Sequence, residues 1–318
     1  MRISVLMAVH NGGADLSRTL DSLAAALPPD SEVVVVDDGS DDSTPHILAS
    51  RSDLPLVVVR QERAGQTRAL NRGLEAVRGD LVARLDAGDV CHPERLVRQA
   101  AALESRPALL ALGCRVRRLD LQGRLLGVSE VVREPERIAR GLLRINLFQH
   151  SALMLRREAL ERVGGYRPFF RFSQDLDLTL RLSESGPLGN LDEALSDWVL
   201  DPGSVSFRHR RSQAAFARIA RDCARARRRG EPDPVEAGTV APPSFPPEEE
   251  GARLAAYHLE VARSLLMGNQ AAAARRELAL AQAHGLAFRA SCPPLALSWA
   301  PAPVRGVLRR LRVGWITR

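Results

Sequence analysis

The first ninety residues alternate between continuous apolar runs and amphipathic segments. Segments 15–27 and 68–80 repeat their apolar residues with the spacing of an α-helix. The apolar runs, predicted to be strands, lie at 3–9, 32–37, 54–60 and 81–86. Because a strand without polar residues must be buried on both faces, this order predicts an α/β fold with a mostly parallel central sheet covered by helices. Open sheets of this kind bind ligands at the carboxyl ends of their strands.

Beyond residue 90 the pattern is less regular. Residues 108–120 and 123–127 predict a β-hairpin, and residues 151–166 predict a strand that runs into a helix. Further helices are predicted at 93–105, 173–186 (with Ser173 as its N-cap), 252–266 and 271–285, the last two as a helical hairpin. The proline- and acid-rich residues 230–251 predict a linker. The predicted organisation is a sheet domain at 1–212, an arginine-rich helix and linker at 213–251, and a small helical region at 252–318.

Composition narrows the function classes. The formal net charge is +7, and every basic residue is arginine, which pairs with phosphate or carboxylate through two parallel hydrogen bonds. Only 4% of residues are aromatic and no zinc-finger spacing occurs, so nucleic acid is not expected as a partner despite the arginine run at 218–230. The four cysteines form no CxxC pair, and no run is long enough to span a bilayer. A signal peptide is not expected before the first strand. These features predict a cytoplasmic protein.

Acidic residues follow two of the predicted strands. Asp37 and Asp38 come directly after a run of valines, and Asp86 and Asp89 lie where the strand at 81–86 ends. Like charges at one sheet edge repel one another unless a cation lies between them, and Mg²⁺ or Mn²⁺ binds carboxylates together with phosphate oxygens. The alternative for DDGSDDS is a turn that leads into a helix, because these residue types favour turns.

Five segments in order resemble the motifs of the family 2 glycosyltransferases, which are inverting enzymes with the nucleotide-sugar-binding GT-A fold. The segments are SVLMAVHN (4–11), VDDGSDDST (36–44), GQTRALNRG (65–73), GDLVARLDAGD (79–89), and GGY (164–166) with QDLDLTLRL (174–182). The resemblance covers about residues 3 to 206. It implies a bacterial enzyme that transfers a sugar from a nucleotide-diphospho-sugar, with a UDP-sugar as the first expectation, to a sugar or lipid-linked acceptor.

The resemblance also implies residue roles. Asp175 is the expected catalytic base, and Asp86 and Asp89 are the expected ligands of Mg²⁺ or Mn²⁺ on the diphosphate. The donor-binding residues are expected to be Ala8, His10, Asn11, Asp37, Asp38, Arg68, Asn71 and Asp86. The acceptor side is expected to include His150, Gly165 and Tyr166, with 166–172 as a flexible loop over the acceptor. A general base is chemically required because a sugar hydroxyl is a weak nucleophile until its proton is removed.

Departures from the family pattern leave alternatives open. Gly88 stands where the family's D-A-D-D has an acid, and Val199 and Asp201 stand where arginine and histidine often occur. A catalytically weak or inactive nucleotide-sugar- or carbohydrate-binding protein on the same fold is therefore the alternative. Asp177 could serve the helix alone, in a surface pair with Arg181 four residues later.

The Q-x-x-R-W motif of processive synthases is absent, which favours a non-processive enzyme. Residues 303–318 are basic and amphipathic, so peripheral contact with a membrane is possible.

Overall fold

The computed structural model describes residues 1–285, so the basic segment 303–318 lies outside the described residues. Contacts divide the chain into two compact units. The first comprises Met1–Val116, Glu130–Asp197 and Phe216–Pro242, and the second comprises Arg117–Ser129, Trp198–Ala215 and the residues from Pro243 on. The first unit therefore contains the final part of the arginine-rich helix and the beginning of the proline-rich segment.

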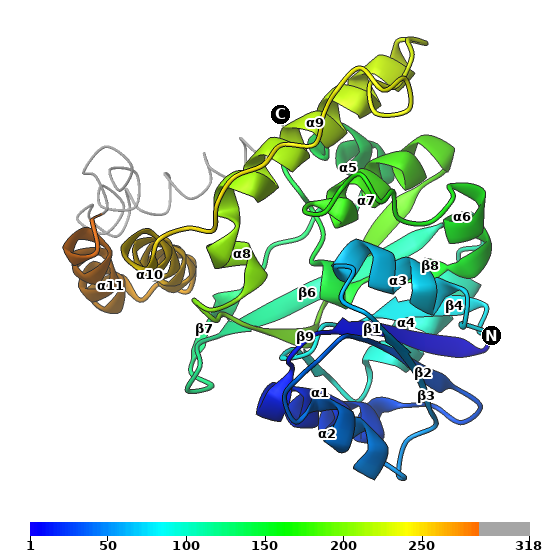
Figure 1. Ribbon diagram of the computed structural model, residues 1–318, viewed down its shortest axis with the longest axis horizontal. Coiled ribbons are helices and arrows are strands. Elements are labelled where there is room, and N and C mark those ends of the chain that lie inside the picture. Colours follow the sequence, from blue (N-terminus) through cyan, green and yellow to red (C-terminus); the bar gives the residue numbers. More distant parts are fainter. Residues whose placement is uncertain (286–318) are drawn as a thin grey trace. The chain divides into compact units, whose positions relative to one another are not determined.

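The strands form a nine-stranded sheet with the order β3-β2-β1-β4-β8-β6-β9-β5, and β7 pairs with β6 (Figure 1). Their bounds are Ile3–Val9 (β1), Glu32–Asp38 (β2), Leu56–Gln61 (β3), Leu81–Arg84 (β4), Val90–Cys91 (β5), Ala111–Leu119 (β6), Leu125–Val128 (β7), Met154–Arg156 (β8) and Leu188–Val199 (β9). Strands β1 to β4 are parallel neighbours, whereas β8 runs antiparallel to both β4 and β6. The predicted α/β class is confirmed, and the carboxyl ends of β1, β2 and β4 meet at one edge.

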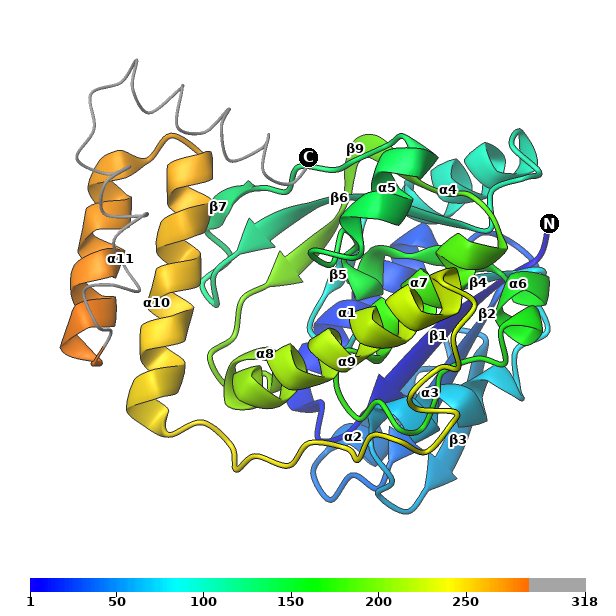
Figure 2. The ribbon, with the colours of Figure 1, turned by 90° about the horizontal axis from the view of Figure 1, so that it is seen from above.

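Helices of the first unit connect its strands and cover the sheet (Figures 1 and 2), and the chain continues into further helices. Their bounds are Gly13–Ala26 (α1), Thr44–Ser50 (α2), Gln66–Leu74 (α3), Arg95–Glu104 (α4), Pro135–Gly141 (α5), Arg157–Arg162 (α6), Gln174–Ser185 (α7), Val205–Arg208 (α8), Arg210–Arg228 (α9), Glu250–Met267 (α10) and Ala271–Ala283 (α11), with a 3₁₀ turn at His150–Ala152 (η1). Several details differ from prediction, and two of them concern the region around α7. Strand β9 was not predicted, and Ser173 precedes α7 without a capping hydrogen bond from its side chain.

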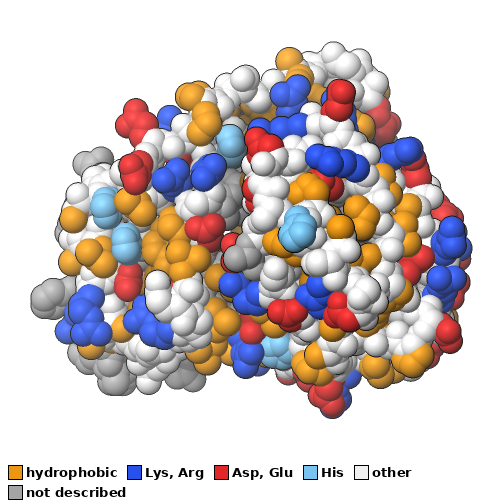
Figure 3. Space-filling view, turned by 60° about the horizontal axis from the view of Figure 1, so that its bottom comes forward, with side chains coloured by type: hydrophobic (Ala, Val, Ile, Leu, Met, Phe, Trp, Pro, Cys, Tyr) orange, Lys and Arg blue, Asp and Glu red, His pale blue; other side chains and the backbone are white. Residues whose placement is uncertain are grey.

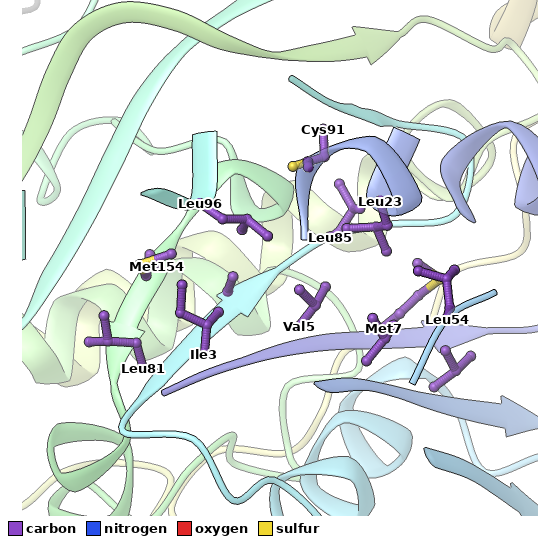
Figure 4. Packing of buried hydrophobic residues seen from close by; sticks show 14 of the residues in the cluster. Ile3, Val5, Met7, Leu23, Leu54, Leu81, Leu85, Cys91, Leu96 and Met154 are labelled. Atoms are coloured by element: carbon purple, nitrogen blue, oxygen red, sulfur yellow. The ribbon is translucent and has the colours of Figure 1, made fainter. Parts of the chain in front are cut away.

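The core of the first unit lies on both faces of the parallel strands. On one face, Val5 and Met7 of β1 lie on the same side as Leu23 of α1 (Figure 4). On the other face, α3 approaches so closely that a Cβ atom on Gly73 would lie 2.3 Å from Leu6 Cδ1. The close approach explains the glycine at this position. Burial on both faces explains why these strands carry no alternating polar residues.

The second unit has its own core. Helices α10 and α11 pack together as the predicted helical hairpin, and β7 contacts α10. The buried residues of this cluster are Leu126, Leu200, Leu259, Val261, Ala262, Leu265, Leu266, Ala274 and Leu278. Across residues 1–285, no helix combines the length and the apolar character needed to cross a membrane.

Candidate active site

Asp41 and Asp42, the last two acids of the DDGSDDS segment, hydrogen-bond the loop that follows β1. The Asn11 side-chain amide donates to Asp41 Oδ1 at 2.7 Å, and the Asp41 backbone N–H donates back to Asn11 Oδ1 at 3.0 Å. Asp42 accepts a hydrogen bond from the Gly13 backbone N–H at 2.9 Å. Burial alone would raise the pKa of Asp42, but hydrogen bonds from Thr44 and Gly13 hold that pKa below its usual value. The turn interpretation therefore accounts for these two acids, and Asn11 has a positioning role in the loop.

Asp37 and Asp38, the first two acids of the same segment, are both buried, with 1% of Asp37 and 4% of Asp38 exposed. The carboxylate of Asp38 accepts hydrogen bonds from the Gln61 side chain at 2.7 Å and from the backbone of 64 and 65 at 2.8 Å. It therefore fastens the loop between β3 and α3. Among the described residues, Asp37 Oδ1 accepts only from the Ser40 backbone at 2.9 Å, and its Oδ2 lies 3.6 Å from Arg60 Nε. Asp37 is thus the better placed of the two to accept a hydrogen bond from a ligand.

The remaining predicted donor residues lie on β1 and α3. His10 Nδ1 lies 3.0 Å from the carbonyl oxygen of Asp38, and Ala8 is half-buried near the end of β1. Arg68 is exposed on α3. The Asn71 side chain instead forms two hydrogen bonds with the backbone of Tyr166, at 2.6 and 2.9 Å. Asn71 therefore anchors the loop before α7, and its contact with a donor stays a prediction.

A buried arginine organises the end of β4. Arg84 is fully buried and its guanidinium donates to Asp86 Oδ1, which also accepts from Gln66 Nε2 at 3.1 Å. Burial alone would raise the pKa of Asp86, but the positive charge of Arg84 lowers it below the usual value. The carboxyl is therefore ionised at neutral pH. Because both donors bind Oδ1, Oδ2 of Asp86 has the greater remaining capacity to accept from a ligand.

Asp89 and Gly88 complete this loop. Asp89 is buried, and its Oδ2 accepts a hydrogen bond from the Ser151 hydroxyl. Gly88 has a φ of +103°, and a Cβ atom built on it would meet nothing within 4 Å. An L-residue rarely adopts this φ, so the loop conformation suits glycine and not the acid that the family pattern has there.

The residues present fit a metal that needs few protein ligands. Within residues 1–285, no group of three or more His, Cys, Asp and Glu side chains is arranged to hold a metal. Asp86 and Asp89 follow β4 by two and five residues, and a Cβ atom on Gly88 between them would meet nothing within 4 Å. Mg²⁺ commonly takes one or two carboxylates and completes its shell with water and phosphate oxygens. The site therefore suits an ion that arrives with a diphosphate.

Asp175 lies in the first turn of α7 and is half-buried. Asn146 Nδ2 donates to its Oδ2 at 2.6 Å. Burial raises the pKa of Asp175 above its usual value, hydrogen bonds from Leu176 and Asn146 oppose the shift, and the charge of Asp86 adds to it. A raised pKa makes the carboxylate a better proton acceptor.

Two glutamines connect Asp175 with the end of β4. Gln174 Nε2 donates to Gln66 Oε1 at 2.9 Å, and Gln66 Nε2 donates in turn to Asp86. Residues 66, 86 and 174 come from α3, the β4 end and α7, so the fold brings three motifs together. The arrangement places a proton acceptor and a candidate metal ligand in one site.

Asp177 has a different environment. Its side chain is 1% exposed and lies between Arg167 Nε, 3.1 Å from each oxygen, and Arg181 Nε at 3.0 Å. The pair with Arg181 is therefore present but buried, and not on the surface. Both carboxylate oxygens of Asp177 are occupied, so this residue serves the structure.

The predicted acceptor-side residues are largely enclosed. His150 is buried and Nε2 shares a hydrogen bond with the Tyr166 hydroxyl at 2.8 Å. Burial, with the nearby positive charge of Arg84, lowers the pKa of His150 to about 3, so its imidazole is neutral at physiological pH. Gly165 presents its carbonyl to Arg181 at 2.7 Å.

The loop at 166–172, which was predicted to be flexible, packs against neighbouring elements, and its flexibility stays a prediction. The Phe170 ring is fully buried and packs edge-on against Phe169 and against Phe216 of α9. The Thr67 hydroxyl also donates to the Phe170 carbonyl at 2.6 Å. Packing from α3 and α9 therefore supports the loop that leads into Asp175.

Three residues of the site were not predicted from the sequence: Arg84, Gln66 and Asn146. Arg84 had a signal, because a charged residue inside the apolar run LVARLD needs a buried partner. Gln66 and Asn146 had none, since a single amide carries no pattern by itself.

Comparison with known proteins identifies the family of the chain. The model of the family "Glycosyl transferase family 2" matches residues 4–164, about half of the chain. The chain belongs to glycosyl transferase family 2. Among curated family 2-like relatives, the amylovoran biosynthesis glycosyltransferase AmsE of Erwinia amylovora is 32% identical over 60% of this chain and 74% of its own length. The putative glycosyltransferase EpsE of Bacillus subtilis is 31% identical over 61% of this chain and 71% of its own.

Solved structures share the fold. S. aureus TarS 1–349 in complex with UDP-GlcNAc has a TM-score of 0.56 and 18% identity, over 87% of this chain and 89% of that chain. The mannosyltransferase PcManGT from Pyrobaculum calidifontis, in complex with GDP-Man and Mn²⁺, has a TM-score of 0.56 and 22% identity, over 96% of this chain and 83% of that chain. At these identities the likeness establishes the GT-A glycosyltransferase fold alone.

Proposed function

We propose that this family 2 glycosyltransferase transfers a sugar from a nucleotide-diphospho-sugar to an acceptor hydroxyl with inversion at the anomeric carbon. The observation that carries the proposal is Asp175, a half-buried carboxylate with a raised pKa, connected through Gln174 and Gln66 to Asp86. An inactive binding protein has no need of such a proton acceptor.

In the proposed reaction Asp175 accepts the proton of the acceptor hydroxyl. The hydroxyl oxygen forms a bond to the anomeric carbon as the bond from that carbon to the diphosphate oxygen breaks. Asp37 binds the base or ribose of the donor, with Ala8, His10 and Arg68 around it. Asp86 and Asp89 would hold Mg²⁺ or Mn²⁺, which would supply positive charge to stabilise the departing diphosphate.

The donor class is supported by the fold relatives. TarS is described in complex with UDP and UDP-GlcNAc, and PcManGT in complex with GDP-Man and Mn²⁺. We propose a UDP-sugar as the donor and a sugar or lipid-linked acceptor of polysaccharide biosynthesis, used at the cytoplasmic side of the membrane. A nucleic-acid partner is not proposed, because acidic and basic side chains are interspersed on the face shown in Figure 3.

The test is transfer from a panel of nucleotide-sugars to lipid-linked and free sugar acceptors, with and without Mn²⁺. Asp175→Asn is expected to retain donor affinity in calorimetry and to lose transfer by about 100- to 10,000-fold. Asp192→Asn, an exposed acid of the same unit, is the control and should leave transfer unchanged. Near-normal transfer by Asp175→Asn would refute the mechanism. Nucleotide-sugar binding by the parent without transfer to any acceptor would instead support the inactive binding protein.

A further inference from the structure

The Asp175 carboxylate accepts a hydrogen bond from a side-chain amide whose orientation is fixed. Asn146 Nδ2 donates to Asp175 Oδ2 at 2.6 Å, while Asn146 Oδ1 accepts the Phe148 backbone N–H at 3.2 Å. A flipped amide would place a donor against the N–H and an acceptor against the carboxylate, so only one orientation satisfies both partners.

The turn that carries Asn146 is fixed from α9. The guanidinium groups of Arg228, Arg221 and Arg225 donate to the carbonyl oxygens of Ala139 at 3.1 Å, Leu142 at 3.4 Å and Leu143 at 3.0 Å. These carbonyls end α5 and begin the turn, where no intrahelical donor is available. Figure 2 shows α9 beside α5 and α7. A segment outside residues 4–164 thus supports the residue that contacts the proposed base.

We propose that Asn146 is a positioning residue for sugar transfer, whose amide holds Asp175 Oδ2 so that the other carboxylate oxygen takes the acceptor's proton. The proposal rests on the proposed role of Asp175 as the base. Other groups that act on Asp175 are the backbone N–H of Leu176, Asp86 from the β4 end and Tyr166 from the loop before α7. The Leu176 donor belongs to the backbone of α7, so among these groups Asn146 is the side chain that donates a hydrogen bond to the carboxylate.

The experiment compares Asn146→Leu and Asn146→Ala with the parent enzyme. Both variants lose the amide, and Leu keeps most of its size. Because misplacement of a reacting group by about 1 Å costs about 100-fold, kcat is expected to fall about 10- to 100-fold, with donor affinity in calorimetry unchanged. The hydrogen bond lowers the pKa of Asp175, so its loss should move the acidic limb of the kcat–pH profile to higher pH.

Ile145→Ala is the matched control, since Ile145 is the exposed neighbour in the same turn and should leave both kcat and the profile unchanged. Asn146 is exposed, so both variants should retain the parent melting temperature. Suppose that Asp175→Asn is inactive, while the Asn146 variants keep the parent kcat or lose rate without a shift of the acidic limb. The positioning role of Asn146 is then refuted, and the role of Asp175 as the base is not. If Asp175→Asn transfers normally, both proposals fail.

Discussion

Two aspartates that are two residues apart on α7 should respond in opposite ways to the same substitution. We expect Asp177→Asn to lower the free energy of unfolding by about 3 to 5 kcal/mol, since removing one member of a buried ion pair leaves the other charges uncompensated. Asp175→Asn should leave stability unchanged or raise it slightly. Its raised pKa means that the ionised carboxylate is less favourable in the folded than in the unfolded protein at neutral pH.

The size of the Asp177 effect follows from its surroundings. The carboxylate faces two guanidinium groups whose side chains are 13% and 8% exposed, and an asparagine would turn N–H donors toward them. Arg167 keeps a second partner, Asp233, at 2.9 Å. The loss should therefore lie nearer 3 than 5 kcal/mol. For a unit of this size, about 3 kcal/mol corresponds to a fall in melting temperature of about 6 to 12 °C.

Urea denaturation at pH 7, followed by circular dichroism, measures both variants against the parent. Sugar transfer by Asp177→Asn, measured where the variant is folded, should be much closer to the parent than transfer by Asp175→Asn. Equal stability losses for the two variants, or a loss below about 1 kcal/mol for Asp177→Asn, would show that the buried network does not hold α7 as described.

Three further changes have defined outcomes. His150 takes up a proton near pH 6.5 when unfolded but only near about 3 when folded, so stability should fall as the pH drops from 6.5 toward 3. His150→Gln should reduce that slope by up to about 1.4 kcal/mol per pH unit in denaturation series, and an unchanged slope would contradict the burial effect. Gly88→Asp should lower stability by about 1 to 3 kcal/mol through its positive φ, and a variant as stable as the parent would show that the loop relaxes. Phe216→Ala should cost about 3 to 5 kcal/mol by opening a cavity beside Phe170, and calorimetry should show a lower melting temperature; a change within error would mean that α9 does not support the loop.

Local pattern was sufficient for the sheet and for one edge of the site. The apolar runs at 3–9, 32–37 and 81–86 became β1, β2 and β4, because buried parallel strands leave no place for polar side chains. Asp37 and Asp86 could then be placed at a common edge, since parallel strands end on the same side of a sheet. Strand β9 was not predicted, because polar residues in its middle interrupt the apolar run and the segment is only half-buried there.

Only the tertiary structure decided which acid does what. Asp38 and Asp37 are neighbours in sequence, yet the loop at 64–65 occupies the first and leaves the second with fewer donors. Asp175 obtains its hydrogen bond from Asn146, a residue 29 positions earlier. Burial and hydrogen-bond partners set the proton affinity of a carboxyl, and both come from segments distant in the chain. The sequence by itself determined where acids gather, and folding determined which of them are occupied and which remain available for chemistry.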